Sequence, residues 1–96
     1  MKFEWDSKKE KKNLEKHGIT FDEASKIFTG RSDFLELFDN NHSEDEDRFI
    51  AIGFISKGVI VVVYVERDLD IIRIISARKA TRSEIKLFGD FLKGNK

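Results

Sequence analysis

Hydrophobic and polar positions along the chain predict five strands and three helices. Near the N-terminus, Phe3 and Trp5 alternate with polar residues, which indicates a short first strand. Four later runs of β-branched and aromatic residues predict four more strands, and they cover residues 34–38, 48–55, 59–66 and 71–80. Between 39 and 47 the chain is rich in Asp, Glu and Asn, which predicts a surface loop.

Each predicted helix opens with a capping-box pattern, in which Ser or Thr is followed three residues later by Glu. The three pairs are Ser7 with Glu10, Thr20 with Glu23, and Thr81 with Glu84. Gly18 and Gly30 are expected to end the first two helices. The first helix is very polar, and Leu14 is its expected apolar anchor.

The predicted order is strand, helix, helix, four strands and a closing helix. Consecutive strands with short connections form antiparallel pairs, so residues 34–80 predict a meander. The expected class is α+β, a small antiparallel sheet with helices packed on it, as a single domain over residues 1–96.

The predicted strand at 71–80 is apolar, yet it carries two arginines. Burying a guanidinium without a partner costs several kcal/mol, so both groups must be paired or reach the rim of the sheet. Strict alternation along a strand puts Arg73 and Arg78 on opposite faces. Arg78 also lies just before the helix that starts at Thr81, and a cation beside a helix N-terminus favours phosphate binding.

Composition narrows the classes of function. The 96 residues have a formal net charge of zero although 38% are charged, so any nucleic-acid site must arise from local clustering of cations. There is no cysteine, which excludes disulfides and thiolate catalysis. The two histidines lack metal-ligand spacing and no glycine-rich phosphate loop is present, so we expect neither metal nor cofactor. The longest apolar run is too short for a bilayer and no signal peptide is recognisable, so the expected location is the cytoplasm.

Three arginines lie at the ends of predicted strands. Arg48 begins one, Arg67 follows one and Arg78 ends one. Strand ends can converge in an antiparallel meander, and converging guanidinium groups would bind a phosphodiester and stabilise developing negative charge. The alternative is that Glu46 or Glu66 simply neutralises a nearby arginine in an ion pair.

A polar stripe follows the first predicted helix. Its members, at helical spacings of three and four, are Lys9, Asn13, Lys16 and His17. The stripe is either a solvated face or a ribbon that contacts phosphate. His17 precedes Gly18 at the end of the helix, where the helix dipole favours a cation, and a histidine there is also suited to general acid–base chemistry.

Several motifs together resemble the BrnT toxin family. Residues 3–18 carry Phe-x-Trp-Asp-x-x-Lys-x-x-x-Asn-x-x-Lys-His-Gly, and Ile-Thr-Phe-Asp-Glu-Ala follows at 19–24. Residues 46–53 are similar to the family's Glu-x-Arg…Gly segment, and the block 73–80 with Glu84 after it is similar to its most recognisable signature. The resemblance covers nearly the whole chain, with the motifs in the family's order.

The resemblance implies a RelE-like fold and a type II toxin that cuts RNA and halts translation. It also implies a cognate BrnA antitoxin that binds the toxin and represses their shared promoter. By motif position Arg48, Arg67 and Arg78 are the expected active-site cations, with Glu46, Lys16 and His17 as further candidates. Phe88 stands where many relatives have Tyr, so a catalytic hydroxyl there would be missing.

These observations lead to one mechanism and one competing class. The mechanism is metal-independent RNA cleavage in which the 2′-hydroxyl attacks the adjacent phosphate, arginines stabilise the transition state, and Glu46 or His17 moves protons. The RNA-binding candidates beside these groups are Lys9, Asn13, Lys16 and Arg73. The alternative is a non-catalytic protein-binding module of the same fold.

Overall fold

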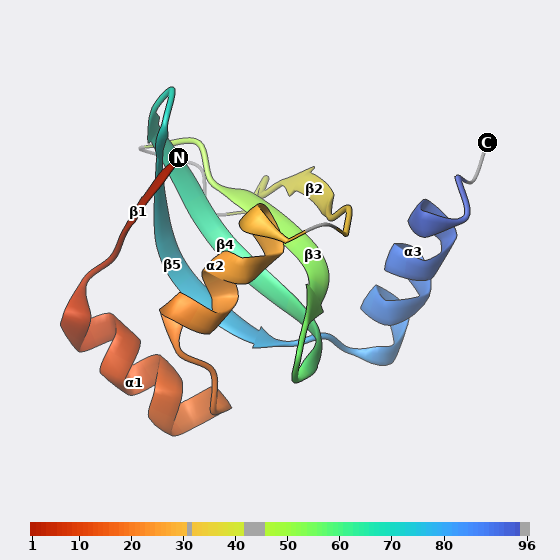
Figure 1. Cartoon of the computed structure of the whole chain (residues 1–96), viewed down its shortest axis with the longest axis horizontal. Helices are drawn as coiled ribbons and strands as arrows, with labels where there is room; N and C mark the ends of the chain where they lie inside the picture. The colour runs from red at the N-terminus through yellow and green to blue at the C-terminus, as the bar shows by residue number, and fades with distance from the viewer. Residues whose placement is uncertain (31, 42–45, 95–96) are drawn as a thin grey trace.

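A computed structural model describes residues 1–30, 32–41 and 46–94, in which the chain forms one mixed five-stranded sheet and three helices (Figure 1). Part of the expected loop at 39–47 lies outside these residues. In chain order the elements are β1 (Lys2–Glu4), α1 (Ser7–His17), α2 (Phe21–Thr29), β2 (Leu35–Phe38), β3 (Phe49–Ile55), β4 (Gly58–Asp68), β5 (Ile71–Lys79) and α3 (Arg82–Leu92). None of the described helices is long and apolar enough to cross a membrane.

The strands lie in the order β1-β5-β4-β3-β2. Strands β2 to β5 form the predicted antiparallel meander, and β1 pairs in parallel with β5. The α+β class is therefore confirmed. The sheet is mixed rather than wholly antiparallel because α1 and α2 and the meander separate β1 from β5 in the sequence, and β1 then adds to the edge of β5.

A β-bulge in β5 changes which side chains share a face. Val63 pairs with Ser76 while Tyr64 pairs with Ile74, so Ile75 is an extra residue with no partner in the register. The bulge reverses the alternation, and the expectation that Arg73 and Arg78 lie on opposite faces is wrong. Both now lie on the face of β4 that carries alternate valines, opposite Val65 and Val61 respectively.

A second irregularity lies at the hairpin between β4 and β5. Glu66 pairs with Ile72 and Asp68 with Ile71, which leaves Arg67 as the extra residue. The predicted end of the fourth strand at residue 66 is therefore wrong, because pairing continues to Asp68 and the connection to β5 is only two residues long.

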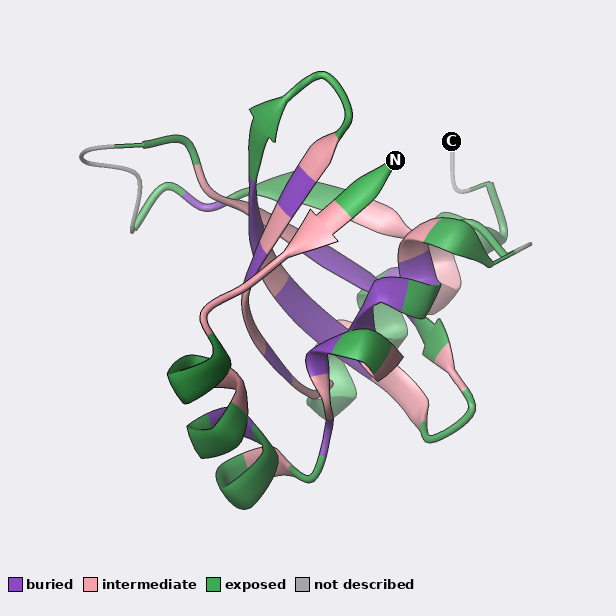
Figure 2. Ribbon diagram, turned by 60° about the vertical axis from the view of Figure 1, so that its left-hand side comes forward, coloured by how far each residue is buried: buried purple, intermediate pink, exposed green. Residues whose placement is uncertain are grey.

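One face of the sheet, here called the covered face, holds the larger core (Figure 2). Helix α2 and the segment before it bury Ile19, Phe21 and Ile27 against this face. Gly53 permits the close approach, since a Cβ there would lie 3.1 Å from Phe34 Cβ and 3.3 Å from Ile27 Cβ.

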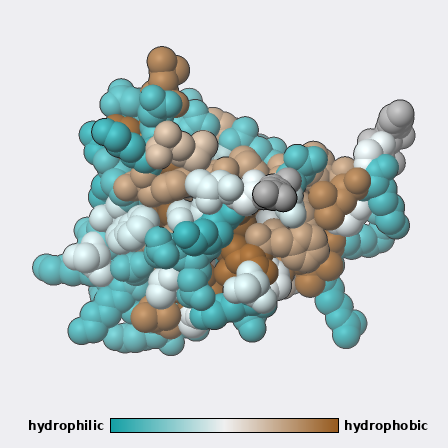
Figure 3. Space-filling model, in the orientation of Figure 1, coloured by the Kyte–Doolittle hydropathy of each residue, from teal (hydrophilic) through white to brown (hydrophobic). Residues whose placement is uncertain are grey.

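The opposite face, here called the open face, carries α3 at one end. Phe88 is 1% exposed and packs with Ile52 and Val61. Because Ile52 and Val61 alternate with residues of the covered face, α3 lies across the sheet from α2. Several apolar side chains of α3 remain exposed, and Figure 3 shows hydrophobic surface in this region of the molecule.

Helix starts follow the capping signals at two of three positions. Thr20 and Thr81 form complete capping boxes with Glu23 and Glu84. At α1 the expectation is wrong, because Asp6 and not Ser7 caps the helix. The Asp6 carboxylate accepts hydrogen bonds from the backbone N–H groups of Lys9 and Lys8, and these bonds lower the pKa of Asp6.

Helix α1 is attached to β5 by a polar side chain. Leu14, the expected anchor, is 42% exposed, whereas Asn13 is 8% exposed. The Asn13 amide donates to the carbonyls of Ala77 (2.8 Å) and Ile19 (3.2 Å), and its Oδ1 accepts from the Ala77 N–H at 3.1 Å. The side chain thus pairs with the outer edge of β5, as a neighbouring strand would.

We predict that Asn13→Ala lowers the free energy of unfolding by about 1–3 kcal/mol, because it leaves both polar backbone groups of Ala77 without their partner. Leu14→Ala, at the adjacent exposed position, should change it by about 0.5 kcal/mol or less. Urea denaturation followed by circular dichroism measures both. A larger loss of stability from Leu14→Ala than from Asn13→Ala would show that Leu14, and not Asn13, anchors α1 to the sheet.

Candidate active site

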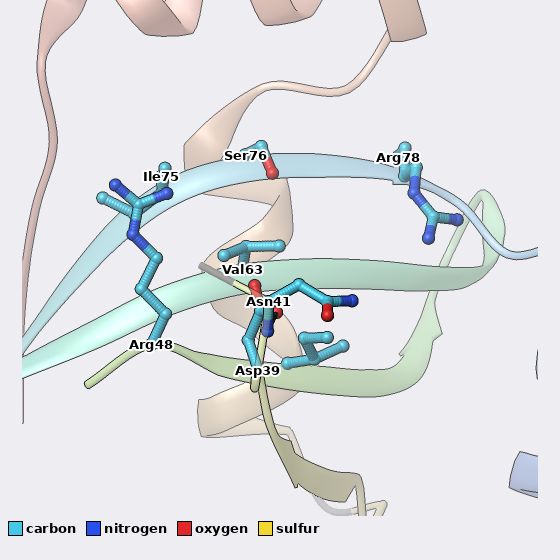
Figure 4. Close-up of a pocket in the computed structure, with 8 residues that line it drawn as sticks. Asp39, Asn41, Arg48, Val63, Ile75, Ser76 and Arg78 are labelled. Carbon is cyan, nitrogen blue, oxygen red and sulfur yellow. Dashed lines mark hydrogen bonds between the residues drawn. The ribbon is translucent and has the colours of Figure 1, made fainter. Parts of the chain in front are cut away.

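The open face contains a cavity of about 390 Å³, here called the sheet cavity, beyond the end that α3 covers. Its floor is formed by Ile50 and Val63, which pair directly across β3 and β4. The complete lining is Asp39, Asn41, Arg48, Ile50, Val63, Ile75, Ser76 and Arg78 (Figure 4). An apolar floor with polar groups at its rim is typical of ligand sites.

Two of the three predicted active-site cations line this cavity. Arg48 precedes β3 and Arg78 lies near the end of β5. Figure 4 shows their guanidinium groups toward opposite ends of the cavity, with Ser76 between them along β5. Arg48 and Arg78 thus share one concave surface, but their guanidinium groups do not meet around a single point as the prediction supposed.

Arg78 is held in place by Glu84. Its Nη1 and Nη2 atoms donate to the two carboxylate oxygens of Glu84, each at 2.8 Å. Glu84 is also the third residue of α3 and accepts a hydrogen bond from the Thr81 N–H. The bond from Arg78, and then that from Thr81, lowers the pKa of Glu84 from 4.5 to about 2. The same carboxylate raises the pKa of Arg78.

A second hollow of about 350 Å³, here called the helix cavity, lies between α1 and β5. Its lining is Lys9, Lys12, Asn13, Lys16, His17, Ile75 and Ser76. The predicted polar stripe of α1 is therefore gathered at one surface. Figure 3 shows mostly hydrophilic side chains over α1. Ile75 and Ser76 line both cavities, so the bulge of β5 is the wall at which they meet.

The predicted residues of the stripe differ in what they can offer a ligand. Lys9 and Lys16 are exposed and His17 is partly buried at the last position of α1. Asn13 is buried, and its three hydrogen bonds go to backbone groups. It therefore fixes α1 against the wall between the cavities.

Arg67 and Arg73 lie apart from both cavities. Each donates through Nη1 to the same oxygen of Glu4, Arg67 at 2.8 Å and Arg73 at 3.0 Å. These bonds, that of Arg73 foremost, lower the pKa of Glu4. Arg67 and Arg73 are therefore in ion pairs, as the alternative predicted, but their carboxylate partner is Glu4 of β1 and not Glu46 or Glu66.

Glu46 and Phe88 lie at the margins of the site. Glu46 Oε1 is 3.8 Å from Nε of Arg48, which is the ion pair that the alternative predicted for Glu46, and its side chain is about half exposed. Phe88 is part of the core under α3 and lines neither cavity. Within residues 1–30, 32–41 and 46–94, no group of three His, Cys, Asp or Glu residues is arranged to hold a metal ion.

Sequence reasoning missed several lining residues. Lys12 lies three residues after Lys9 and four before Lys16, so helical spacing alone would have added it to the stripe. Ser76 had no detectable signal, because it faces the cavities only as a result of the bulge. Asn41 lies in the acidic segment that was assigned to a surface loop.

We predict that the Arg78–Glu84 pair makes stability fall in acid. A carboxyl whose pKa is depressed on folding stabilises the protein above its unfolded value near 4.5, and this contribution is lost as the pH falls toward 2. Glu84→Gln should therefore flatten the decline of the urea midpoint between about pH 4.5 and 2. Glu15→Gln, at an exposed position of α1, should leave the decline as in the unmodified protein. Parallel curves for all three proteins would contradict the assignment.

Comparison with known proteins agrees with this architecture. The structure matches a 1.1 Å crystal structure of the Brucella abortus ribonuclease toxin BrnT with a TM-score of 0.64 and 25% sequence identity, covering 85% of this chain and 99% of that one. No protein with a curated description matches the sequence. Residues 5–84 match the family described as "Ribonuclease toxin, BrnT, of type II toxin-antitoxin system". This match covers the cations of both cavities and most of the fold, and the chain therefore belongs to the BrnT family of ribonuclease toxins.

Proposed function

We propose that this toxin is an endoribonuclease that cleaves RNA without a metal ion, through attack of a 2′-hydroxyl on the adjacent phosphate. One observation carries the proposal. Arg48 and Arg78 line one cavity, and the lysines of α1 line a second cavity that shares its wall. Arginines at the first would hold the reacting phosphate, and lysines at the second would hold the continuing backbone of the RNA.

The chemistry requires stabilisation of a phosphate that gains negative charge. A guanidinium group has five N–H donors, of which Glu84 takes one on each terminal nitrogen of Arg78 and the Lys79 carbonyl accepts a further bond from Nη1 at 3.2 Å. The remaining donors, on Nε and Nη2, are held in a fixed orientation by these bonds. Preorganised donors of this kind stabilise a transition state without the cost of reorienting during the reaction.

Proton transfer needs a base for the 2′-hydroxyl and an acid for the leaving oxygen. We propose His17 for one of these roles, acting on a phosphate bound at the wall that the two cavities share, because His17 lines the helix cavity together with Ile75 and Ser76 of that wall. Glu46 is the second candidate, since it lies beside Arg48 at the sheet cavity. Lys9 and Lys16 bind the RNA backbone, and Asn13 contributes by fixing α1.

A type II toxin has an antitoxin partner, and membership of the family extends this to the present chain. We propose that the partner is a BrnA-type antitoxin and that the toxin inhibits translation by degrading RNA.

The first test is removal of each cavity arginine. Arg48→Ala and Arg78→Ala should each lower the cleavage rate by about 10²–10³-fold, because each removes one charge-stabilising donor. Arg78→Lys should also lose activity, since an ammonium group cannot reproduce the two-pronged bond to Glu84. Lys26→Ala, an exposed cation on α2, is the control. Thermal denaturation establishes that each variant is folded, and full activity in folded arginine variants would overturn their roles.

The second test concerns the metal and the competing binding module. Purified toxin is incubated with RNA in the presence of EDTA, and cleavage should proceed at the rate seen without EDTA. Cleavage that stops in EDTA and returns with a divalent cation would refute the metal-free mechanism. RNA that stays intact under both conditions, with the protein folded, would favour the non-catalytic binding module.

A further inference from the structure

The open face carries a second group of cations outside the sheet cavity, at the Arg48 end of the cavity and away from Arg78. Arg73 precedes Arg78 by five residues on β5, and the bulge at Ile75 turns both side chains to this face. Arg73 lies opposite Val65 and Arg78 opposite Val61, so four regular steps separate them, which correspond to roughly 13 Å at the usual rise of a strand. The two arginines therefore begin at separate points along one path across the open face.

Arg67 joins Arg73 at the far end of this path. Arg67, the extra residue of the bulge in β4, donates to Glu4 of β1, where Arg73 donates to the same carboxylate oxygen. Three neighbouring strands of the sheet therefore contribute to one cluster, which has two positive charges and one negative charge.

We propose that Arg67 and Arg73 form a further phosphate subsite, outside the sheet cavity, that binds the RNA strand at a nucleotide beyond those in the cavity. This inference rests on the proposed function, because the same RNA would occupy the sheet cavity. Glu4 holds the two guanidinium groups together in the free protein and neutralises one of their two charges, and the Asp6 carboxylate also interacts electrostatically with Arg73.

The donors and the exposure of the cluster support this role. Each arginine has one N–H···O bond to Glu4, so most of its five donors are not taken up by that carboxylate. The side chains of Arg67 and Arg73 are 56% and 34% exposed, which leaves them accessible to a ligand. A pair built only for stability would gain little here, since exposed ion pairs contribute about 0–1 kcal/mol.

The subsite is tested by binding, separately from cleavage. The probes are 2′-O-methyl oligoribonucleotides, which lack the attacking hydroxyl: a trinucleotide, and versions extended at the 5′ or the 3′ end to about twelve residues. Fluorescence anisotropy measures their dissociation constants over a range of salt concentrations. Wild-type protein should bind one of the extended probes more tightly than the trinucleotide.

Two variants should change this preference in opposite directions. Arg73→Gln should weaken binding of the extended probe about threefold or more and reduce its salt slope by about 0.7, the value for one contact to a single strand. Glu4→Gln removes the competing carboxylate and should tighten binding of the extended probe. Both variants should affect the trinucleotide much less.

Each variant has a control with the same change in net charge. Lys26→Gln matches Arg73→Gln and Asp22→Asn matches Glu4→Gln, and both controls lie at exposed positions of α2, which packs on the covered face. Neither control should alter the preference for the extended probe or the salt slope of its binding. Equal effects on short and extended probes, or no tightening by Glu4→Gln in a folded protein, would overturn the subsite. If the wild-type protein does not cleave unmodified RNA but still binds the extended probe more tightly than the trinucleotide, only the proposed reaction is refuted.

Discussion

The arrangement of the site depends on the hydrogen bonds between Asn13 and the backbone of Ala77. Past the short β1, the outer edge of β5 has no neighbouring strand in the described sheet, and the amide of Asn13 supplies the donor and acceptor that such a strand would offer. This contact lies immediately after the bulge at Ile75, so it holds α1 against the one segment that lines both cavities. A buried polar side chain is costly unless all its groups are paired, and here the pairing attaches the basic helix to the sheet.

The bulge itself determines which cations can act together. With unbroken alternation, Arg78 would lie over the covered face, among the apolar side chains under α2. The extra residue reverses the phase, so Ala77 enters the covered core while Arg78 reaches the open face. One inserted residue thereby solves two problems, since it avoids burial of a guanidinium and places that guanidinium at the sheet cavity.

Sequence patterns were sufficient for the elements and their order, because periodicity and capping residues are local signals. The Thr20 and Thr81 capping boxes and the four-strand meander follow directly from them. What the sequence could not show is non-local. Nothing in the run of Ile and Val around Ile75 distinguishes a bulged strand from a regular one, and the partner of Arg67 and Arg73 lies on β1, more than sixty residues away. The buried role of Asn13 was hidden for the same reason, because a polar residue in a polar helix gives no sign of the backbone it will meet.

Glu84 has two tasks that impose different chemical requirements. As the last residue of the capping box it needs only an oxygen that can accept from the Thr81 N–H, and a glutamine serves that purpose as well as a glutamate. The bond to Arg78 needs two equivalent anionic oxygens in one plane. An acid-to-amide replacement at residue 84 would therefore keep the helix cap and lose the two-pronged hold on Arg78, so one substitution can separate the start of α3 from the orientation of the guanidinium group.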